Sequence, residues 1–186
     1  MTGRRRLSES ISEGDGISIL VEIDGDMPPE GRTTIDAVAL VTPVNCIPAA
    51  VSLPVLVRGG SPAEAGAAGA DGWLLAAGGD ENVLAKRYAE ARELGLECVV
   101  GIADEDELGL ALAEVDPEIV LLSPREDDSD ADIVERVLEL LPDVPAGKLA
   151  VAELPLATRA DLVALERAGV DGLLVRFEHA ATLFAL

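Results

Sequence analysis

Eight short apolar runs follow one another along this chain, and their order constrains the fold more than any other feature. The runs begin at residues 17, 36, 53, 72, 97, 118, 148 and 172. From residue 53 onward, most neighbouring runs are separated by a stretch with helical periodicity. The runs are rich in Val, Leu and Ile, which is typical of parallel strands covered by helices. The pattern predicts an α/β fold, a compact TIM-like (β/α)8 barrel whose chemistry lies at the C-terminal ends of the strands.

Helix start and stop signals lie between the later runs. Asp104 is a good N-cap, Gly95 and Gly169 are C-caps, and Pro142 ends a helical pattern. These signals predict helices over residues 81–95, 104–115, 130–141 and 158–168.

The first two connections are too short for full crossover helices. The first contains Pro28 and Pro29, and the second, residues 42–52, contains Pro43 and Pro48. We therefore predict that the first two crossover helices are shortened or missing, with a seven-stranded or open half-barrel as the alternative. Residues 1–16 are predicted to be a flexible polar arm, and residues 17–186 to form a single β/α-barrel domain.

The formal net charge of −21 limits the partners of this chain. A field of that sign repels nucleic acid and anionic membranes, so we expect neither as a partner. No apolar run approaches the length of a membrane span, and no apolar segment of a signal peptide follows Arg4-Arg5-Arg6. We expect a cytoplasmic protein. Most of the acids are interpreted as a solvated surface, and their excess suggests a halophilic, salt-adapted setting.

Several segments of the chain match one known family in wording and order. They are 53-LPVLVRG, 67-AAGADGWLLAA, 91-ARELGLECVVGIADEDEL, 118-EIVLLSPRE, 146-AGKLAVAEL and 158-TRADLVALERAGVDGLLV, with a weaker echo in 20-LVEIDGDMPPEG. From residue 53 onward, the chain thus resembles the indole-3-glycerol-phosphate synthase family of tryptophan biosynthesis. The resemblance implies a ribulose-phosphate-binding barrel. Enzymes of the family close an indole ring with decarboxylation and dehydration, using one lysine as general acid, a second lysine that holds the substrate, and a carboxylate.

The positions that match the family's catalytic groups hold other residues here. The first strand's lysine is Asp24, the general-acid lysine is Arg58, and the fifth strand's glutamate is Gly101. A guanidinium, whose pKa lies far above neutral, cannot release a proton near neutral pH. The phosphate-binding turns have changed as well, because Pro155 offers no N–H and Arg176 begins the segment after the last strand. We therefore expect a pseudoenzyme without synthase activity.

Two acids at the family's positions remain, Glu22 and Glu153, and they are the candidate catalytic residues. The candidate ligand- or phosphate-binding residues at the same level of the barrel are Arg58, Arg125, Arg176, Asp24 and Ser123. Two interpretations stay open, an ion-pair network that closes the barrel mouth or a remodelled anion site. We expect no metal ion and no cofactor.

The expected function is the binding of a small phosphorylated ligand or of a partner subunit. The alternative is an active synthase-like lyase, or another sugar-phosphate enzyme that uses Glu22, Asp24, Glu153 and Arg58. Because the short first connections would leave apolar strand surface uncovered, we also expect a homo-oligomer or a partner subunit over the first two strands.

The charge predicts that stability depends on salt. At molar salt the Debye length falls to about 3 Å, so the repulsion among the excess acids is screened. Lowering the salt to about 50 mM should lower the melting temperature measured by circular dichroism, because the Debye length grows severalfold. An unchanged melting temperature between the two conditions would contradict this expectation.

Overall fold

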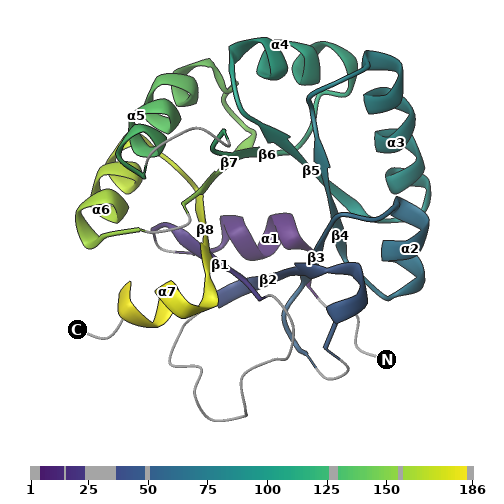
Figure 1. Cartoon of the computed structure of the whole chain (residues 1–186), viewed down its shortest axis with the longest axis horizontal. Coiled ribbons are helices and arrows are strands. Elements are labelled where there is room, and N and C mark those ends of the chain that lie inside the picture. Colours follow the sequence, from purple (N-terminus) through teal and green to yellow (C-terminus); the bar gives the residue numbers. More distant parts are fainter. Residues whose placement is uncertain are drawn as a thin grey trace.

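The computed structural model describes residues 5–14, 16–23, 37–48, 51–125, 130–154 and 157–183. The strands are β1 Ser18–Glu22, β2 Ala37–Pro43, β3 Val55–Arg58, β4 Gly72–Ala76, β5 Glu97–Ile102, β6 Ile119–Leu122, β7 Leu149–Glu153 and β8 Gly172–Arg176. They form a closed parallel barrel in sequence order, in which β1 pairs with both β2 and β8 (Figure 1). The predicted TIM-like barrel is confirmed, and the open and seven-stranded alternatives are excluded.

From β3 onward, a helix follows each strand and lies on the outside of the barrel (Figure 1). These helices are α2 Pro62–Ala67, α3 Glu81–Glu93, α4 Glu105–Glu114, α5 Asp130–Leu140, α6 Arg159–Ala168 and α7 Phe177–Leu183. The four helices predicted from the sequence are confirmed within two residues at each end. Their caps act as expected, since Asp104 accepts the Glu107 N–H at 2.9 Å and Gly169 has a φ of 96°. None of the helices among the described residues has the length and apolar character needed to cross a membrane.

Among its described residues, the second crossover, between β2 and β3, contains the single 3-10 turn Val44–Cys46 and no longer helix, as predicted for this connection. The first crossover lies outside the described residues. Ile19, Val21 and Leu40, on β1 and β2, are only 6%, 2% and 8% exposed. These positions are therefore not part of an uncovered apolar surface, which was our reason for expecting a partner over the first two strands. That partner stays a prediction.

Side chains along the strands alternate between two apolar layers. One layer fills the barrel and contains Leu20, Leu56, Leu74, Val99 and Val151. The other layer packs beneath the helices and includes Trp73, Leu75 and Leu173. Because the interior is filled by side chains, access for a ligand is left to the ends of the barrel and to gaps between its helices.

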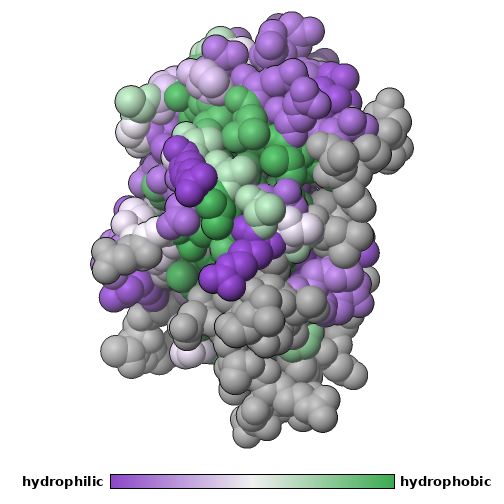
Figure 2. Space-filling view, turned by 90° about the vertical axis from the view of Figure 1, so that its left-hand side faces the viewer, coloured by the Kyte–Doolittle hydropathy of each residue, from purple (hydrophilic) through white to green (hydrophobic). Residues whose placement is uncertain are grey.

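One side of the outer surface is only partly polar. Figure 2 faces the side on which α5, α6 and α7 lie and shows apolar side chains gathered between hydrophilic ones. Leu138 of α5 is one of the exposed large apolar residues, at 37% exposure.

The N-terminal segment differs from its prediction. Residues Leu7–Ser12 form helix α1, so the flexible polar arm predicted over residues 1–16 is wrong for this segment. Leu7 and Ile11 are 0% and 2% exposed and join the apolar cluster inside the barrel. The carboxylate of Glu97, the first residue of β5, accepts the backbone N–H groups of Leu7 and Ser8. Helix α1 therefore closes the N-terminal end of the barrel.

Truncating Leu7 to Ala should lower the free energy of unfolding by roughly 2–5 kcal/mol, because it opens a cavity beneath the closed barrel. Urea denaturation followed by circular dichroism measures the change. Glu9→Ala, on the exposed face of the same helix, is the matched control and should change stability by less than about 0.5 kcal/mol. Equal stability of the two variants would show that α1 does not pack there.

Candidate functional site

The C-terminal mouth of the barrel collects the charged residues that end three strands. Glu22 ends β1, Arg58 ends β3 and Glu153 ends β7. Each lies two residues beyond a side chain of the interior layer, so alternation along the strand turns it toward the barrel axis. The sequence folds this way because each strand interior is apolar and only its last inward position is charged.

Arg58 bridges the two carboxylates. Its Nε lies 2.8 Å from Glu22 Oε1, and its Nη2 donates to Glu153 Oε1 at 2.7 Å. The Nε contact is an ion pair without the geometry of a hydrogen bond. Ser123, just after β6, donates its hydroxyl to Glu153 Oε2 at 2.8 Å. The predicted residues Glu22, Arg58, Ser123 and Glu153 therefore form one cluster, which we call the mouth cluster.

The mouth cluster is shielded in part from solvent. The side chains of Arg58, Glu22 and Glu153 are 35%, 23% and 15% exposed. In such a setting a charged pair is stronger than on an open surface, although water still screens it. The guanidinium can orient an anion or hold the two carboxylates apart, but it cannot deliver a proton. The geometry thus matches the ion-pair network expected from the sequence.

The other predicted site residues have different places. Arg125 forms an ion pair with Asp104 at the N-terminus of α4. The Glu107 backbone N–H, and then Arg125, hold the pKa of the Asp104 carboxyl below its usual value. Arg176 ends β8 in register with Glu22 and is exposed. Asp24 lies outside the described residues, as does Pro155.

Neither lysine of the chain contributes an amine to the mouth. Lys148 lies at the start of β7, at the opposite end of the barrel, where its Nζ donates to the Pro117 carbonyl at 2.9 Å and pairs with Asp116. Lys86 is exposed on α3. The absence of a proton-donating amine, predicted from the sequence, therefore holds for the described part of the mouth.

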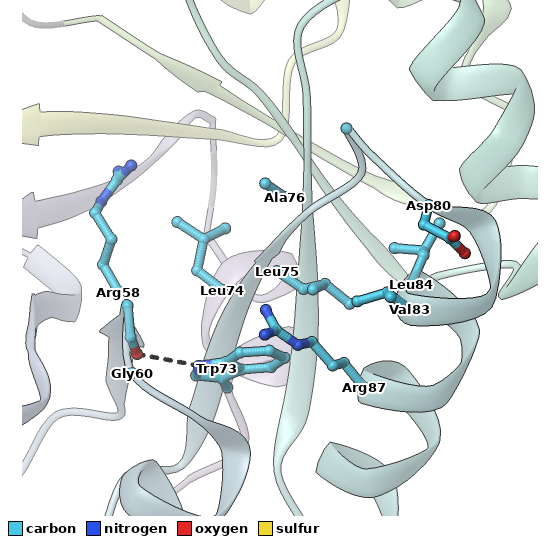
Figure 3. Close-up of a pocket in the computed structure, with 12 residues that line it drawn as sticks. Arg58, Gly60, Trp73, Leu74, Leu75, Ala76, Asp80, Val83, Leu84 and Arg87 are labelled. Atoms are coloured by element: carbon cyan, nitrogen blue, oxygen red, sulfur yellow. Dashed lines mark hydrogen bonds between the residues drawn. The ribbon is translucent and has the colours of Figure 1, made fainter.

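Sequence reasoning missed a pocket of about 350 Å³ beside the mouth. It lies where β3, β4 and α3 meet, with Trp73, Val83 and Arg87 on its walls (Figure 3). Trp73 Nε1 donates to the Gly59 carbonyl at 3.2 Å, which fixes the ring beneath the turn after β3. Two sequence features could have indicated this pocket: the glycine pair Gly59-Gly60 directly after β3, and Arg87 on α3.

The barrel fold agrees with comparisons of the sequence. The family model described as indole-3-glycerol phosphate synthase matches residues 62–177. The chain belongs to the indole-3-glycerol phosphate synthase family. It is 38% identical over 113 residues to the indole-3-glycerol phosphate synthase of Variovorax paradoxus (strain S110). The match covers 60% of this chain and 42% of that synthase, so the chain spans less than half the length of this relative.

Solved structures show the same fold at low sequence identity. The 3-hexulose-6-phosphate synthase of Salmonella typhimurium has a TM-score of 0.67 at 17% identity, covering 86% of this chain and 89% of that one. The N-acetylmannosamine-6-phosphate 2-epimerase of Clostridium perfringens has a TM-score of 0.68 at 12% identity, covering 96% and 93%. At such identities the likeness concerns the barrel fold alone.

Replacing Arg58 by Met should destabilise this synthase-family barrel by about 1–3 kcal/mol in urea denaturation. Two neighbouring carboxylates would lose their shared cation, and partial exposure keeps the loss below that of a fully buried pair. Arg176→Met, at the exposed end of β8, is the control and should be close to neutral. An Arg58 variant as stable as the control would contradict the bridging role.

Proposed function

We propose that this chain is a non-catalytic member of the indole-3-glycerol phosphate synthase family that binds a small phosphorylated ligand at the barrel mouth. The observation that carries the proposal is the position of Arg58. It stands where the family resemblance puts the general-acid lysine, and it is held between Glu22 and Glu153 at 2.8 and 2.7 Å.

The loss of catalysis follows from proton transfer. Each general acid or base contributes about 10²–10⁴-fold to the rate of such a reaction. Arg58 keeps its proton near neutral pH, and the amine of Lys148 lies at the far end of the barrel. Glu153 is engaged by Arg58 and Ser123, so its oxygens already accept hydrogen bonds from protein groups. No described residue of the mouth can replace the amine.

The capacity to bind is supported by what remains. A guanidinium carries five N–H donors in a planar fork that matches phosphate geometry. The Nε and Nη2 atoms of Arg58 face the two acids, while Arg176 is exposed beside Glu22 at the end of the adjoining strand. A phosphoryl group that approaches the mouth would meet Arg176 first and could then share Arg58 with the carboxylates.

A second candidate function is an active lyase, or another sugar-phosphate enzyme that uses Glu22, Asp24, Glu153 and Arg58. The observation in its favour is that Glu22 and Glu153, the two acids at family positions, both contact Arg58 and are only 23% and 15% exposed.

We also propose that the protein works in a salt-adapted cytoplasm, under either function. The net charge of −21 supports this setting.

The decisive assay follows turnover of carboxyphenylamino-deoxyribulose phosphate by the fluorescence of the indole product, in high salt, with a lysine-containing synthase of the family as positive control. The purified full chain should bind this compound in calorimetry without any rate above background, and Arg176→Met should weaken the binding. A measurable rate that Glu153→Ala abolishes would instead establish the enzyme. Failure of the compound to bind would refute the phosphorylated-ligand function.

A further inference from the structure

Helix α3, on the outside of the barrel (Figure 1), exposes large apolar side chains at both of its ends. Three such side chains are exposed among the residues that the structure describes. Two of them are Val83, in the first turn of α3, and Leu94, its C-cap residue, at 47% and 49% exposure. Because an α-helix turns by about 100° per residue, side chains eleven positions apart point in nearly the same direction. Val83 and Leu94 therefore mark the two ends of one face.

Two charged residues lie between these ends. Arg87 and Glu90 fall with Val83 and Leu94 in a sector of about 60° around the helix axis. Arg87 is exposed, and Glu90 is partly exposed. Neither forms an ion pair or a side-chain hydrogen bond with another residue of the described part of the chain. We call these four residues the α3 face; it presents an unpaired cation beside an unpaired anion.

The order of residues on the α3 face is complementary to its own reverse. The face reads apolar, cation, anion, apolar, with spacings of four, three and four positions. In the opposite direction the spacings are the same, and cation and anion exchange places. An antiparallel second copy would therefore set Val83 against Leu94 of that copy, and Arg87 against Glu90 of that copy, with each contact made twice. This reciprocity is what an isologous two-fold interface requires.

The charges around the α3 face also favour a second copy there. Between residues 83 and 94 the chain has three cations, Lys86, Arg87 and Arg92, and only two acids. The next helix, α4, has four acids and no cation. Two chains of net charge −21 repel each other, so an approach over α3 meets less repulsion than an approach over α4.

The neighbouring helix α2 leaves room for this approach. It is only six residues long, and its exposed positions include Ala63 and Ala67. A Cβ added at Gly66 would lie 4.0 Å from the Leu94 Cβ, so α2 is directly beside one end of the α3 face. Small side chains at this border allow a second helix to lie close to α3.

We propose that two copies of this chain form a two-fold dimer in which their α3 faces pack antiparallel. A helix of 13 residues is about 20 Å long, so the contact is smaller than the roughly 800 Å² per partner that stable complexes bury. The dimer therefore dissociates on dilution. The contact lies on the outside of the barrel and is independent of the ligand proposed for the mouth.

Sedimentation velocity of the purified full chain in molar salt tests the proposal. The parent chain should shift from monomer to dimer between about 10 μM and 1 mM protein. Leu94→Asp should raise the dissociation constant at least about tenfold, because it places a charge inside the contact. Its position is half exposed, so the fold should persist, which circular dichroism verifies.

Charge exchange tests the antiparallel arrangement. Arg87→Glu and Glu90→Arg should each weaken the dimer about tenfold, because each sets like charges against one another. The double variant should regain the affinity of the parent chain, since cation and anion have only changed places. A mixture of the two single variants should also dimerise, because one chain then offers two anions and the other two cations. Arg92→Glu, on the opposite side of α3, makes the same charge change as Arg87→Glu and should leave the dimer unchanged.

Three results would each overturn the proposal. A chain that stays monomeric up to about 1 mM would leave the α3 face to a different partner. A dimer that Leu94→Asp does not weaken would have its contact elsewhere, for example over β1 and β2. Absence of recovery in the double variant or in the mixture would show that Arg87 and Glu90 do not face each other across a two-fold axis.

Discussion

One guanidinium ties three strands together across the mouth of this barrel. Arg58 ends β3, and its two carboxylate partners end β1 and β7. Two carboxylates that face the same barrel axis would repel each other. The guanidinium between Glu22 and Glu153 offsets that repulsion and allows both to lie at the mouth. The same cation cannot act as an acid in chemistry that needs proton transfer. The stability of the mouth, and the lack of proton transfer in the function proposed for it, therefore depend on the same residue.

Most of the fold could be predicted from the sequence, because local and global signals agree. Apolar runs gave the strands, and capping residues such as Asp104 and Gly169 set the ends of the helices. Helix α1 could not be predicted in this way. Its six residues are too few for a periodic signal, and only Leu7 and Ile11 are apolar. Its position is determined by tertiary contacts with Glu97 and the barrel interior, which no local pattern encodes.

The mouth cluster could be predicted in part, for a geometric reason. In a closed parallel barrel all strand ends meet at one rim, so the last inward side chains of distant strands become neighbours. This brought Glu22, Arg58, Ser123 and Glu153 together as expected. Arg125 was harder to place, because its pairing with Asp104 depends on where the next helix begins. The pocket between β4 and α3 was missed because its lining comes from β3, β4 and α3, whose side chains meet only in the folded barrel.

Arg58 and Glu153 stabilise each other across the barrel mouth. A double-mutant cycle with Arg58→Met, Glu153→Gln and the double variant, measured by urea denaturation at constant salt, isolates that interaction from the effects of each substitution alone. We predict a favourable coupling of about 1 kcal/mol or more, which decreases as salt is added. A coupling indistinguishable from zero would mean that the two residues do not share an ion pair and that Arg58 does not hold the ends of β3 and β7 together at the mouth.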